Sequence, residues 1–391
     1  MSVERLNPET MPNRQAISVT QVVKAGDTVY IASQAALSSE GTVIGLGEPD
    51  TQVTKVYDDI DMACEAVGGT LHNVVSLFHL PAPPEYERNI AEGGKRLLGP
   101  KPSTTTSAIL PILPYDGLLL AANAIAVVGE TAKSRESINP PALPKLEGHS
   151  QVVKVGNVVY ISGQFGYGKD GRVVGLNVED QVKLVYENLD ICLRAAGASR
   201  GDVVKSSIFY IHPSHYDIIC KVSEDFYGDN PPAGIMALAL LGDPDAKVEI
   251  DAIAVIGEKK LRLNPETMFK PRVFTNIVQA GNTAYISGQA PVDKTGALVG
   301  RGDHEAQIAQ MYRNLEAALE AIGAGPLNVV RAPMYYIRPE YFANIVKARG
   351  EFWGPAGTTP PSMPVMGLPN PDWMVSIEAI TVLDSLLSKI N

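Results

Sequence analysis

Hydrophobic and polar positions repeat along this chain with a long period. Three stretches, 26–34, 156–164 and 281–289, each open on a Gly-Asp or Gly-Asn pair and run into β-branched and aromatic residues that end on Gln. A turn pair followed by such a run is typical of a β-hairpin. A pattern that returns after about 130 residues predicts three tandem copies of one structural unit.

The same order of helix and strand patterns follows each hairpin. In the second copy, apolar residues recur at helical spacing from Val182 to Leu193, and Gly197 ends the helix. A strand, a second helix and a last apolar strand complete each copy. The predicted middle strands are 74–80, 203–211 and 329–337, the second helices begin at Tyr86, Tyr216 and Tyr341, and the last strands are 118–127, 248–255 and 375–382.

This ββαβαβ order predicts an α+β domain in which two helices cover one face of a sheet. The opposite face also carries apolar residues, so we expect the neighbouring copies to cover it and the chain to close as an intramolecular pseudo-trimer. Polar, Pro-bearing linkers near 129–144 and 257–271 divide the chain into predicted domains 1–132, 133–260 and 261–391.

The composition is that of a folded, acidic protein. Of the 391 residues, 45% are hydrophobic and 19% are charged, and the formal net charge is −10. Nucleic acids and anionic membranes are bound by clustered Lys and Arg, so neither partner is expected. The first residues hold no apolar signal region, and no apolar run approaches the ~20 residues of a membrane span. We therefore expect a cytoplasmic protein.

No metal or organic cofactor is predicted. Cys64, Cys192 and Cys220 include no close pair, which argues against a disulfide framework and a zinc site. His212 and His215 lie three residues apart, but no third ligand is evident in the sequence. The sequence also has no phosphate-binding Gly-rich loop, no Gly-x-Ser-x-Gly elbow and no dinucleotide fingerprint.

Several short motifs carry a resemblance to a known family. Tyr-Ile-Ser-Gly-Gln occurs at 160–164 and 285–289, Tyr-Glu-Asn-Leu at 186–189, and Val-Glu-Ile-Asp-Ala-Ile-Ala at 248–254. Together they resemble the RidA/YjgF superfamily, and the resemblance covers the chain three times. It implies chorismate-mutase-like domains, usually homotrimeric, with pockets between adjacent subunits. It also implies an activity such as hydrolysis of reactive imines and enamines to ketones and ammonia.

The resemblance further implies an Arg that binds the substrate carboxylate, two residues after a Pro. Thr104, Gly234 and Met363 stand at the corresponding positions of the three copies, and Met236 stands where copy two would carry the adjacent Cys. None of the three can replace the bidentate pairing of a guanidinium with a carboxylate. Hydrolysis of ordinary 2-imino acids in the usual pose is therefore not expected. Arg349 could lend charge to a neighbouring cleft, but a solvated surface position is the favoured alternative.

The water-positioning Glu of the resembled family corresponds to Ala121, Glu249 and Ser376, so only the second copy keeps it. His149 takes the place of the family's N-terminal aromatic residue in the same copy. We expect Glu249 and His149 to be the catalytic pair. The alternatives are a solvent-facing strand Glu and a loop His that caps the following strand.

The remaining candidates are predicted to bind substrate. Backbone N–H groups of the Ser-Gly strand could hold a carbonyl oxygen or oxyanion. The threonines offer hydroxyl groups, although strand propensity alone would explain them. His79, at a strand end, and Cys220 are expected to be structural. The predicted substrate-binding residues are Thr104, Thr106, Ser162, Gly163, Gln164, Met236, Phe274, Ser287 and Gly288.

The leading hypothesis is a cofactor-independent enzyme with a rebuilt site, in a specialised metabolic or biosynthetic pathway. It would hydrolyse or rearrange an imine, enamine or related reactive carbonyl compound by acid–base chemistry, as a monomer closed on itself. One alternative is a non-catalytic ligand-binding or scaffold protein with decayed clefts. Another is a chorismatase-like hydrolase or lyase, which would need basic residues for a dicarboxylate.

Overall fold

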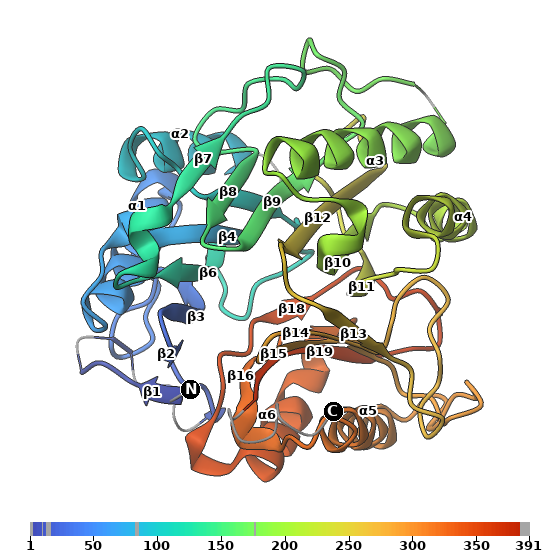
Figure 1. The fold of residues 1–391 in the computed structure, drawn as a ribbon. Coiled ribbons are helices and arrows are strands. Elements are labelled where there is room, and N and C mark those ends of the chain that lie inside the picture. The colour runs from blue at the N-terminus through green and yellow to red at the C-terminus, as the bar shows by residue number, and fades with distance from the viewer. Residues whose placement is uncertain (1–2, 10, 13–16, 83–85, 176, 384–391) are drawn as a thin grey trace.

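The computed structural model describes the chain except for residues 1–2, 10, 13–16, 83–85, 176 and 384–391. The described residues form three mixed sheets, one for each predicted copy, grouped around the middle of the molecule with the long helices outside (Figure 1). No helix in this described part is long and apolar enough to cross a membrane.

Copy one forms a six-stranded sheet in the order β1-β2-β3-β6-β4-β5. The last strand therefore lies inside the sheet, antiparallel to both β3 and β4. Its elements are β1 (Val3–Leu6), β2 (Val22–Ala25), β3 (Thr28–Ala35), α1 (Pro49–Glu65), β4 (Val74–Pro81), α2 (Glu87–Leu97), β5 (Thr104–Ser107) and β6 (Leu120–Val127).

Copy two repeats this topology in the order β7-β8-β9-β12-β10-β11. The side chain of Asn177 accepts a hydrogen bond from the Asp180 N–H and caps its first helix. Its elements are β7 (Glu136–Ile138), β8 (Val152–Val155), β9 (Val158–Gln164), α3 (Val178–Ala195), β10 (Val203–Tyr210), α4 (Tyr216–Tyr227), β11 (Ala233–Leu238) and β12 (Val248–Val255).

Copy three has the order β13-β14-β15-β19-β17-β18, and β16 also pairs with β19. The single strand predicted over 329–337 is interrupted at Pro333, which cannot donate to the ladder. Its elements are β13 (Lys260–Leu263), β14 (Ile277–Ala280), β15 (Thr283–Gln289), α5 (His304–Glu320), β16 (Val329–Arg331), β17 (Met334–Tyr336), α6 (Phe342–Trp353), β18 (Ser362–Pro364) and β19 (Val375–Val382).

Two short strands in each copy were not predicted. One leads into the hairpin, and for β7 and β13 it lies inside the stretches expected to be linkers. The other, β5, β11 or β18, follows the second helix and pairs in parallel with the middle strand. Strands of three to six residues are too short for a clear alternation of polar and apolar positions.

The sheet faces turned away from the helices share one apolar core, as predicted. Residues from all three copies are buried in it, including the equivalent tyrosines Tyr30, Tyr160 and Tyr285. Since each sheet would otherwise expose this face to water, burying it against the other two stabilises the association of the copies. The expectation that neighbouring copies cover one another is confirmed.

Equivalent contacts join each copy to the next. β4 lies against β8, β10 lies against β14, and β16 lies against β2. Three arginines donate across these boundaries to backbone carbonyls: Arg135 to Val74, Arg262 to Val203, and Arg5 to Val329. Every copy therefore contacts both others, and the third boundary closes the arrangement.

Charged side chains are buried near the centre of the three copies. Lys205 of copy two pairs with Glu378 of copy three, with 2.9 Å between Nζ and Oε2, and the two side chains are 10% and 2% exposed. The Tyr335 hydroxyl donates to the same carboxylate at 3.1 Å. Charges removed from water need such partners, so this cluster favours one arrangement of the copies.

Candidate active site

A cavity of about 240 Å³ lies between copies one and two. Copy one contributes β4, β5, α1 and α2. Copy two contributes β9, β12, α3, the segment before β8 and the loops that follow β9 and precede β12. We call it the histidine cavity, after the two imidazoles in its wall. The polar residues that line it are Tyr57, His79, Thr105, Ser107, His149, Gln151, Gln164, Tyr167, Asn188, Asp243 and Glu249.

Glu249 lies on β12 and is 1% exposed, so it is not the solvent-facing strand residue of the alternative hypothesis. Its Oε1 accepts a hydrogen bond from the backbone N–H of Ser107, in the other copy, at 3.4 Å. A side chain on Gly163 would place its Cβ only 1.7 Å from Oε1. The glycine of the Ser-Gly strand therefore makes room for the carboxylate.

His149 lies in the segment before β8 and is half-buried. Its Nδ1 is 3.1 Å from the backbone oxygen of Glu147. Because a carbonyl oxygen only accepts, Nδ1 carries the proton and Nε2 is left as an acceptor. Burial lowers the pKa of His149 to about 4, so this imidazole is uncharged at neutral pH.

His79 on β4 faces His149 from copy one and is 2% exposed. Its Nε2 is 3.1 Å from the Tyr57 hydroxyl, whereas Nδ1 has no hydrogen-bond partner among the described residues. Burial, followed by the nearby His149, lowers the pKa of His79 to about 3. Sequence reasoning placed this residue outside the site. One feature of the sequence marks His79 as unusual: copies two and three have the apolar residues Ile208 and Met334 at the equivalent strand position.

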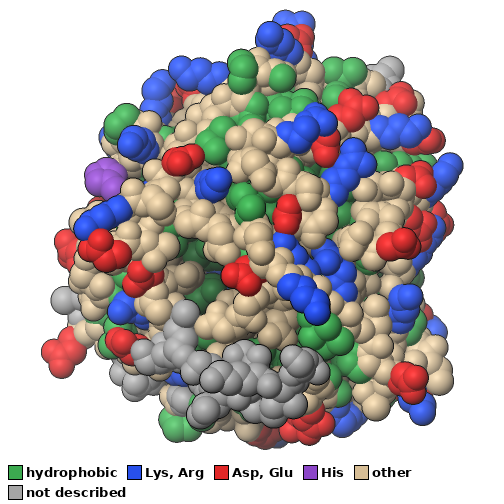
Figure 2. Space-filling model, in the orientation of Figure 1, with side chains coloured by type: hydrophobic (Ala, Val, Ile, Leu, Met, Phe, Trp, Pro, Cys, Tyr) green, Lys and Arg blue, Asp and Glu red, His purple; other side chains and the backbone are tan. Residues whose placement is uncertain are grey.

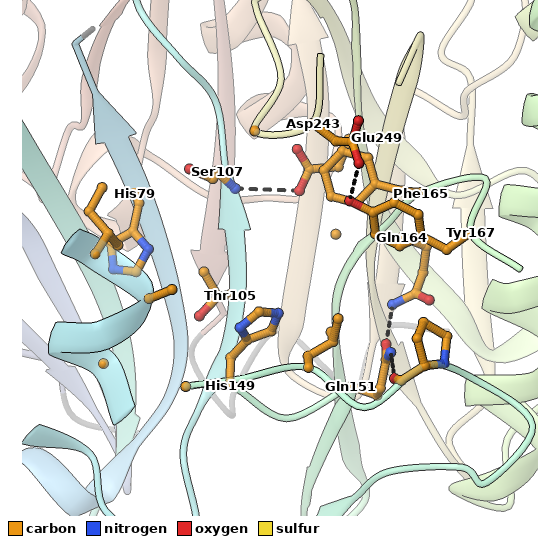
Figure 3. Close-up of a pocket in the computed structure, with 18 of the residues that line it drawn as sticks. His79, Thr105, Ser107, His149, Gln151, Gln164, Phe165, Tyr167, Asp243 and Glu249 are labelled. Carbon is orange, nitrogen blue, oxygen red and sulfur yellow. Dashed lines mark hydrogen bonds between the residues drawn. The ribbon is translucent and has the colours of Figure 1, made fainter. Parts of the chain in front are cut away.

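The opposite end of the histidine cavity is acidic. The Tyr167 hydroxyl donates to Asp243 Oδ2 at 3.1 Å, and the Phe165 and Tyr167 rings lie 5.1 Å apart. Figure 3 shows the two imidazoles near Thr105, and Asp243, Glu249 and Tyr167 gathered at the other end. Sequence reasoning missed Asp243 and Tyr167, which precede and follow the strands that carry the motifs.

Gln164 and Ser162 support the wall in different ways. Gln164 Nε2 donates to Gln151 Oε1 at 2.9 Å, which holds the two side chains together in the cavity. The Ser162 hydroxyl accepts from the Thr105 N–H at 2.9 Å and donates to the Ser150 carbonyl at 2.7 Å. Ser162 thus joins β9 to β5 of the other copy instead of lining the cavity.

Thr104 and Thr106 do not line this cavity, contrary to the prediction. The Thr104 hydroxyl donates to the Val75 carbonyl, and the Thr106 hydroxyl donates to Asp251 near the buried charges. Side chains alternate along a strand, so a shift of one residue reverses every orientation. Thr105 and Ser107 are the residues of β5 that face the cavity.

The strand register shows where the shift arose. The Thr105 N–H bonds the Ser162 hydroxyl as the Gly234 N–H bonds the Ser287 hydroxyl, at 2.9 Å in each case. Thr105 is therefore the counterpart of Gly234, one residue later than predicted. The counterpart is still not an arginine.

A second cavity, of about 400 Å³, lies between copies two and three. We call it the aromatic cavity. Met236, Phe274 and Gly288 line it, whereas Ser287 joins two strands through its bond to the Gly234 N–H. Ser376 occupies the place that Glu249 has in copy two. Other residues that line it are Tyr216, Ile235, Met268, Phe269, Arg272, Asn276, Gln289, Asn314 and Trp373.

The boundary between copies three and one contains a buried arginine. Arg349 on α6 is 1% exposed, so the favoured interpretation as a solvated residue was wrong. Its Nη2 donates to the Ser362 hydroxyl at 3.0 Å and its Nη1 to the Ile17 carbonyl at 3.4 Å. The guanidinium thus occupies space between these copies and joins them.

Within the described residues, no group of three His, Cys, Asp or Glu side chains could hold a metal ion. The three cysteines are buried and unpaired. Burial raises the pKa of Cys220 to about 11, which keeps this thiol protonated and unreactive at neutral pH. On the face drawn in Figure 2, acidic and basic side chains are interspersed instead of gathered into a basic stripe.

Comparison with known proteins fits the repeated topology. The model of the family described as Endoribonuclease L-PSP matches residues 140–256 and 270–383, which is more than half of the chain. The chain belongs to this family. The two matched segments coincide with copies two and three, and the sheet of copy one has the same strand order.

Two relatives of this chain are each about one copy long. A RutC family protein of Pyrococcus abyssi is 31% identical and matches over 31% of this chain and 97% of its own length. A 2-iminobutanoate/2-iminopropanoate deaminase of Dermatophagoides farinae is 33% identical over 30% of this chain and 94% of its own length. The resemblance to the RidA/YjgF superfamily in tandem copies is thereby confirmed.

Two solved structures resemble this chain. RidA from the Antarctic bacterium Psychrobacter sp. is 31% identical and covers 31% of this chain and all of its own, with a TM-score of 0.30 for the whole chain. A chorismatase covers 80% of this chain and 93% of its own at 13% identity, with a TM-score of 0.52. The second likeness concerns the fold alone, and the predicted α+β class is confirmed.

Proposed function

We propose that the histidine cavity is the active site of a cofactor-independent hydrolase that converts a reactive imine or enamine into a carbonyl compound. The observation that carries the proposal is Glu249: a carboxylate, 1% exposed, held in the cavity wall between Gly163 and the Ser107 N–H. Copies one and three have Ala121 and Ser376 at this position. The imine-deaminase name of a relative supports the reaction class.

The chemistry requires one group that accepts and returns a proton. As a water oxygen adds to the imine carbon, the Glu249 carboxylate takes a proton from the water and passes it to the nitrogen, which gives a carbinolamine. Glu249 then moves the hydroxyl proton to the nitrogen, the C–N bond breaks, and ammonia or an amine leaves with the bonding pair. The carbonyl product forms and the carboxylate is regenerated.

The two imidazoles position the substrate in this proposal. At neutral pH both are uncharged, because burial lowers both pKa values. His149 Nε2 is an acceptor that suits a nitrogen-bound proton of the substrate. The cavity encloses the reacting atoms between two copies, which limits competing water.

The test is an imine-trapping assay. Imines are generated in place by an oxidase, semicarbazide traps the surviving imine, and the protein lowers the yield of semicarbazone. Glu249→Gln should reduce kcat by about 100-fold or more, while the matched variant Ser376→Ala in the aromatic cavity leaves it unchanged. Full activity in Glu249→Gln would remove Glu249 from the mechanism. A wild-type protein that accelerates no imine but binds small molecules would favour the non-catalytic ligand-binding function.

We also propose that the working unit is one chain. Each copy already has both neighbours within the chain, so a further chain is not needed to complete a cavity. Light scattering should give a solution mass near 41.8 kDa. A stable trimer of chains would contradict this proposal without touching the chemistry of the histidine cavity.

A further inference from the structure

The charge of the histidine cavity restricts its substrate. Its described lining includes two carboxylates, Asp243 and Glu249, and no Lys or Arg. Lys95, which follows the lining residue Gly94 on α2, pairs with Glu147 at 3.5 Å, and both are well exposed. Lys95 is thus in solvent and outside the lining.

The imidazoles do not supply the missing positive charge. His79 and His149 lie in the wall, and burial lowers their pKa values to about 3 and about 4. Both are therefore neutral near pH 7. Whether or not Glu249 holds a proton, the described lining carries no positive charge.

We infer that the histidine cavity takes imines that lack a carboxylate group, such as those formed from simple amines, with a neutral or protonated nitrogen. The inference rests on the proposed function and names the substrate class of the same site. A carboxylate entering this cavity would lose its hydration and meet Asp243 and Glu249 without a cation in the wall to offset the cost. Thr105 stands where a guanidinium would be needed.

The acidic end is suited to a cation. Asp243 is held by the Tyr167 hydroxyl at 3.1 Å and by the Asp245 N–H at 2.9 Å, so its carboxylate is oriented before a ligand arrives. The Phe165 and Tyr167 rings line the same end, 5.1 Å apart. Aromatic faces next to a carboxylate stabilise a protonated iminium or ammonium group through cation–π and ionic contacts.

The deciding experiment compares two groups of imines in the trapping assay with the full chain. An amine oxidase acting on benzylamine supplies an imine without a carboxylate, and an amino-acid oxidase acting on phenylalanine or leucine supplies imines with one. We expect kcat/KM to be higher for the benzylamine-derived imine by about 100-fold. Equal or faster hydrolysis of the carboxylate imines would overturn the inference and leave the proposed function standing. Hydrolysis of neither group would overturn the proposed function itself.

Thr105→Arg tests the missing cation directly. This variant should raise the kcat/KM for carboxylate imines by about 10-fold or more and lower it for the benzylamine-derived imine. Thr105→Val, similar in volume, is the matched control and should leave the preference as it is. A Thr105→Arg variant that folds and keeps the wild-type preference would contradict the argument from charge.

Calorimetry supplies a readout that does not depend on turnover. Benzylamine should bind the wild-type protein more tightly than benzoate, and Asp243→Asn should weaken benzylamine binding by about 10-fold. Asp245→Asn keeps its backbone N–H and lies outside the cavity, so it should bind as wild type does. Tighter binding of benzoate than of benzylamine would overturn the inference.

Discussion

The histidine cavity and the aromatic cavity occupy equivalent boundaries but differ in the side chains that could carry acid–base chemistry. Glu249 in the first corresponds to Ser376 in the second, and His149 corresponds to Phe274. The supporting bonds are nevertheless the same, since the Ser162 and Ser287 hydroxyls each accept a backbone N–H from the neighbouring copy at 2.9 Å. The hydrogen bonds that join the copies are therefore shared, whereas the side chains at the positions of Glu249 and His149 differ.

This difference shows what fusion of the copies allows. In a symmetric homotrimer, each substitution appears at every boundary. In a fused chain each boundary changes independently, so one can keep a buried carboxylate while another has Ser376 in its place and a third is occupied by Arg349.

The largest effect is expected at the buried charges that hold the copies in register. Lys205→Met removes the ion-pair partner of Glu378, which is 2% exposed and keeps the electrostatic attraction of the buried Arg331. The variant should lower the free energy of unfolding by about 3 kcal/mol in urea titrations. Lys183→Met removes a surface pair with Glu179 and should cost no more than about 1 kcal/mol. An equal loss of unfolding free energy in the two variants would show that the Lys205–Glu378 pair does not hold the three copies in place.

A smaller but more selective effect is expected at two equivalent glycines. Gly163→Ala would place a Cβ 1.7 Å from Glu249 Oε1 and should lower imine hydrolysis by about 100-fold. Gly288→Ala meets Ile235 Cδ1 at 2.3 Å in the aromatic cavity and should leave hydrolysis intact. If both variants lost activity in the trapping assay, the two cavities would not be functionally separate.

The next prediction concerns pH. Burial lowers the pKa of folded His79 to about 3 from 6.5, so between these values the unfolded chain binds a proton that the folded protein does not. Titration of His79 therefore leaves the free energy of unfolding unchanged above pH 6.5. As the pH falls from 6.5 towards 3, protonation of His79 in the unfolded chain lowers the free energy of unfolding by up to about 1.4 kcal/mol per pH unit. His79→Leu should therefore lose less stability than wild type between pH 7 and pH 5 in urea titrations. Ile208→Leu, at the equivalent position of copy two, should keep the wild-type slope, and parallel slopes for His79→Leu and wild type would contradict the assignment.

The smallest effect is expected at the rim of the aromatic cavity. Arg272 pairs with Asp217 at 2.8 Å and with Glu224 at 2.9 Å, all of them partly exposed. Arg272→Met should cost less than about 1 kcal/mol in thermal or urea unfolding and leave imine hydrolysis unchanged. A large loss of imine hydrolysis in Arg272→Met would indicate that the aromatic cavity, and not the histidine cavity, is the active site.

Much of the fold was predictable because its signals are local. The last strands predicted over 248–255 and 375–382 are observed as β12 and β19, and α4 begins at Tyr216 as expected. The strand predicted over 329–337 failed at Pro333, where the ladder is interrupted. The Thr-rich β5 was missed because four residues hold too little pattern to assign a strand.

The site was predictable only in part. Glu249 and His149, chosen from the sequence, lie in one cavity, together with Gly163 and Gln164. Thr104 and Thr106 were assigned in place of Thr105, because the register of β5 against its neighbours cannot be read from a run of three identical residues. His79 was overlooked because its role depends on a residue of another copy.

Three features could be read from the sequence alone: the chain contains three related copies, each copy has a definite order of elements, and only copy two has a Glu at the position of Glu249, where copies one and three have Ala121 and Ser376. Those features follow from hydrophobic period and from comparison of the copies. Three features came from the packing of the copies: which copies meet at Glu249, which face of β5 lines the cavity, and that His79 lies in the same wall. The reason is that the Glu249 and Ser107 backbone N–H contact spans 142 residues of sequence, and contacts at that separation depend on how whole sheets pack.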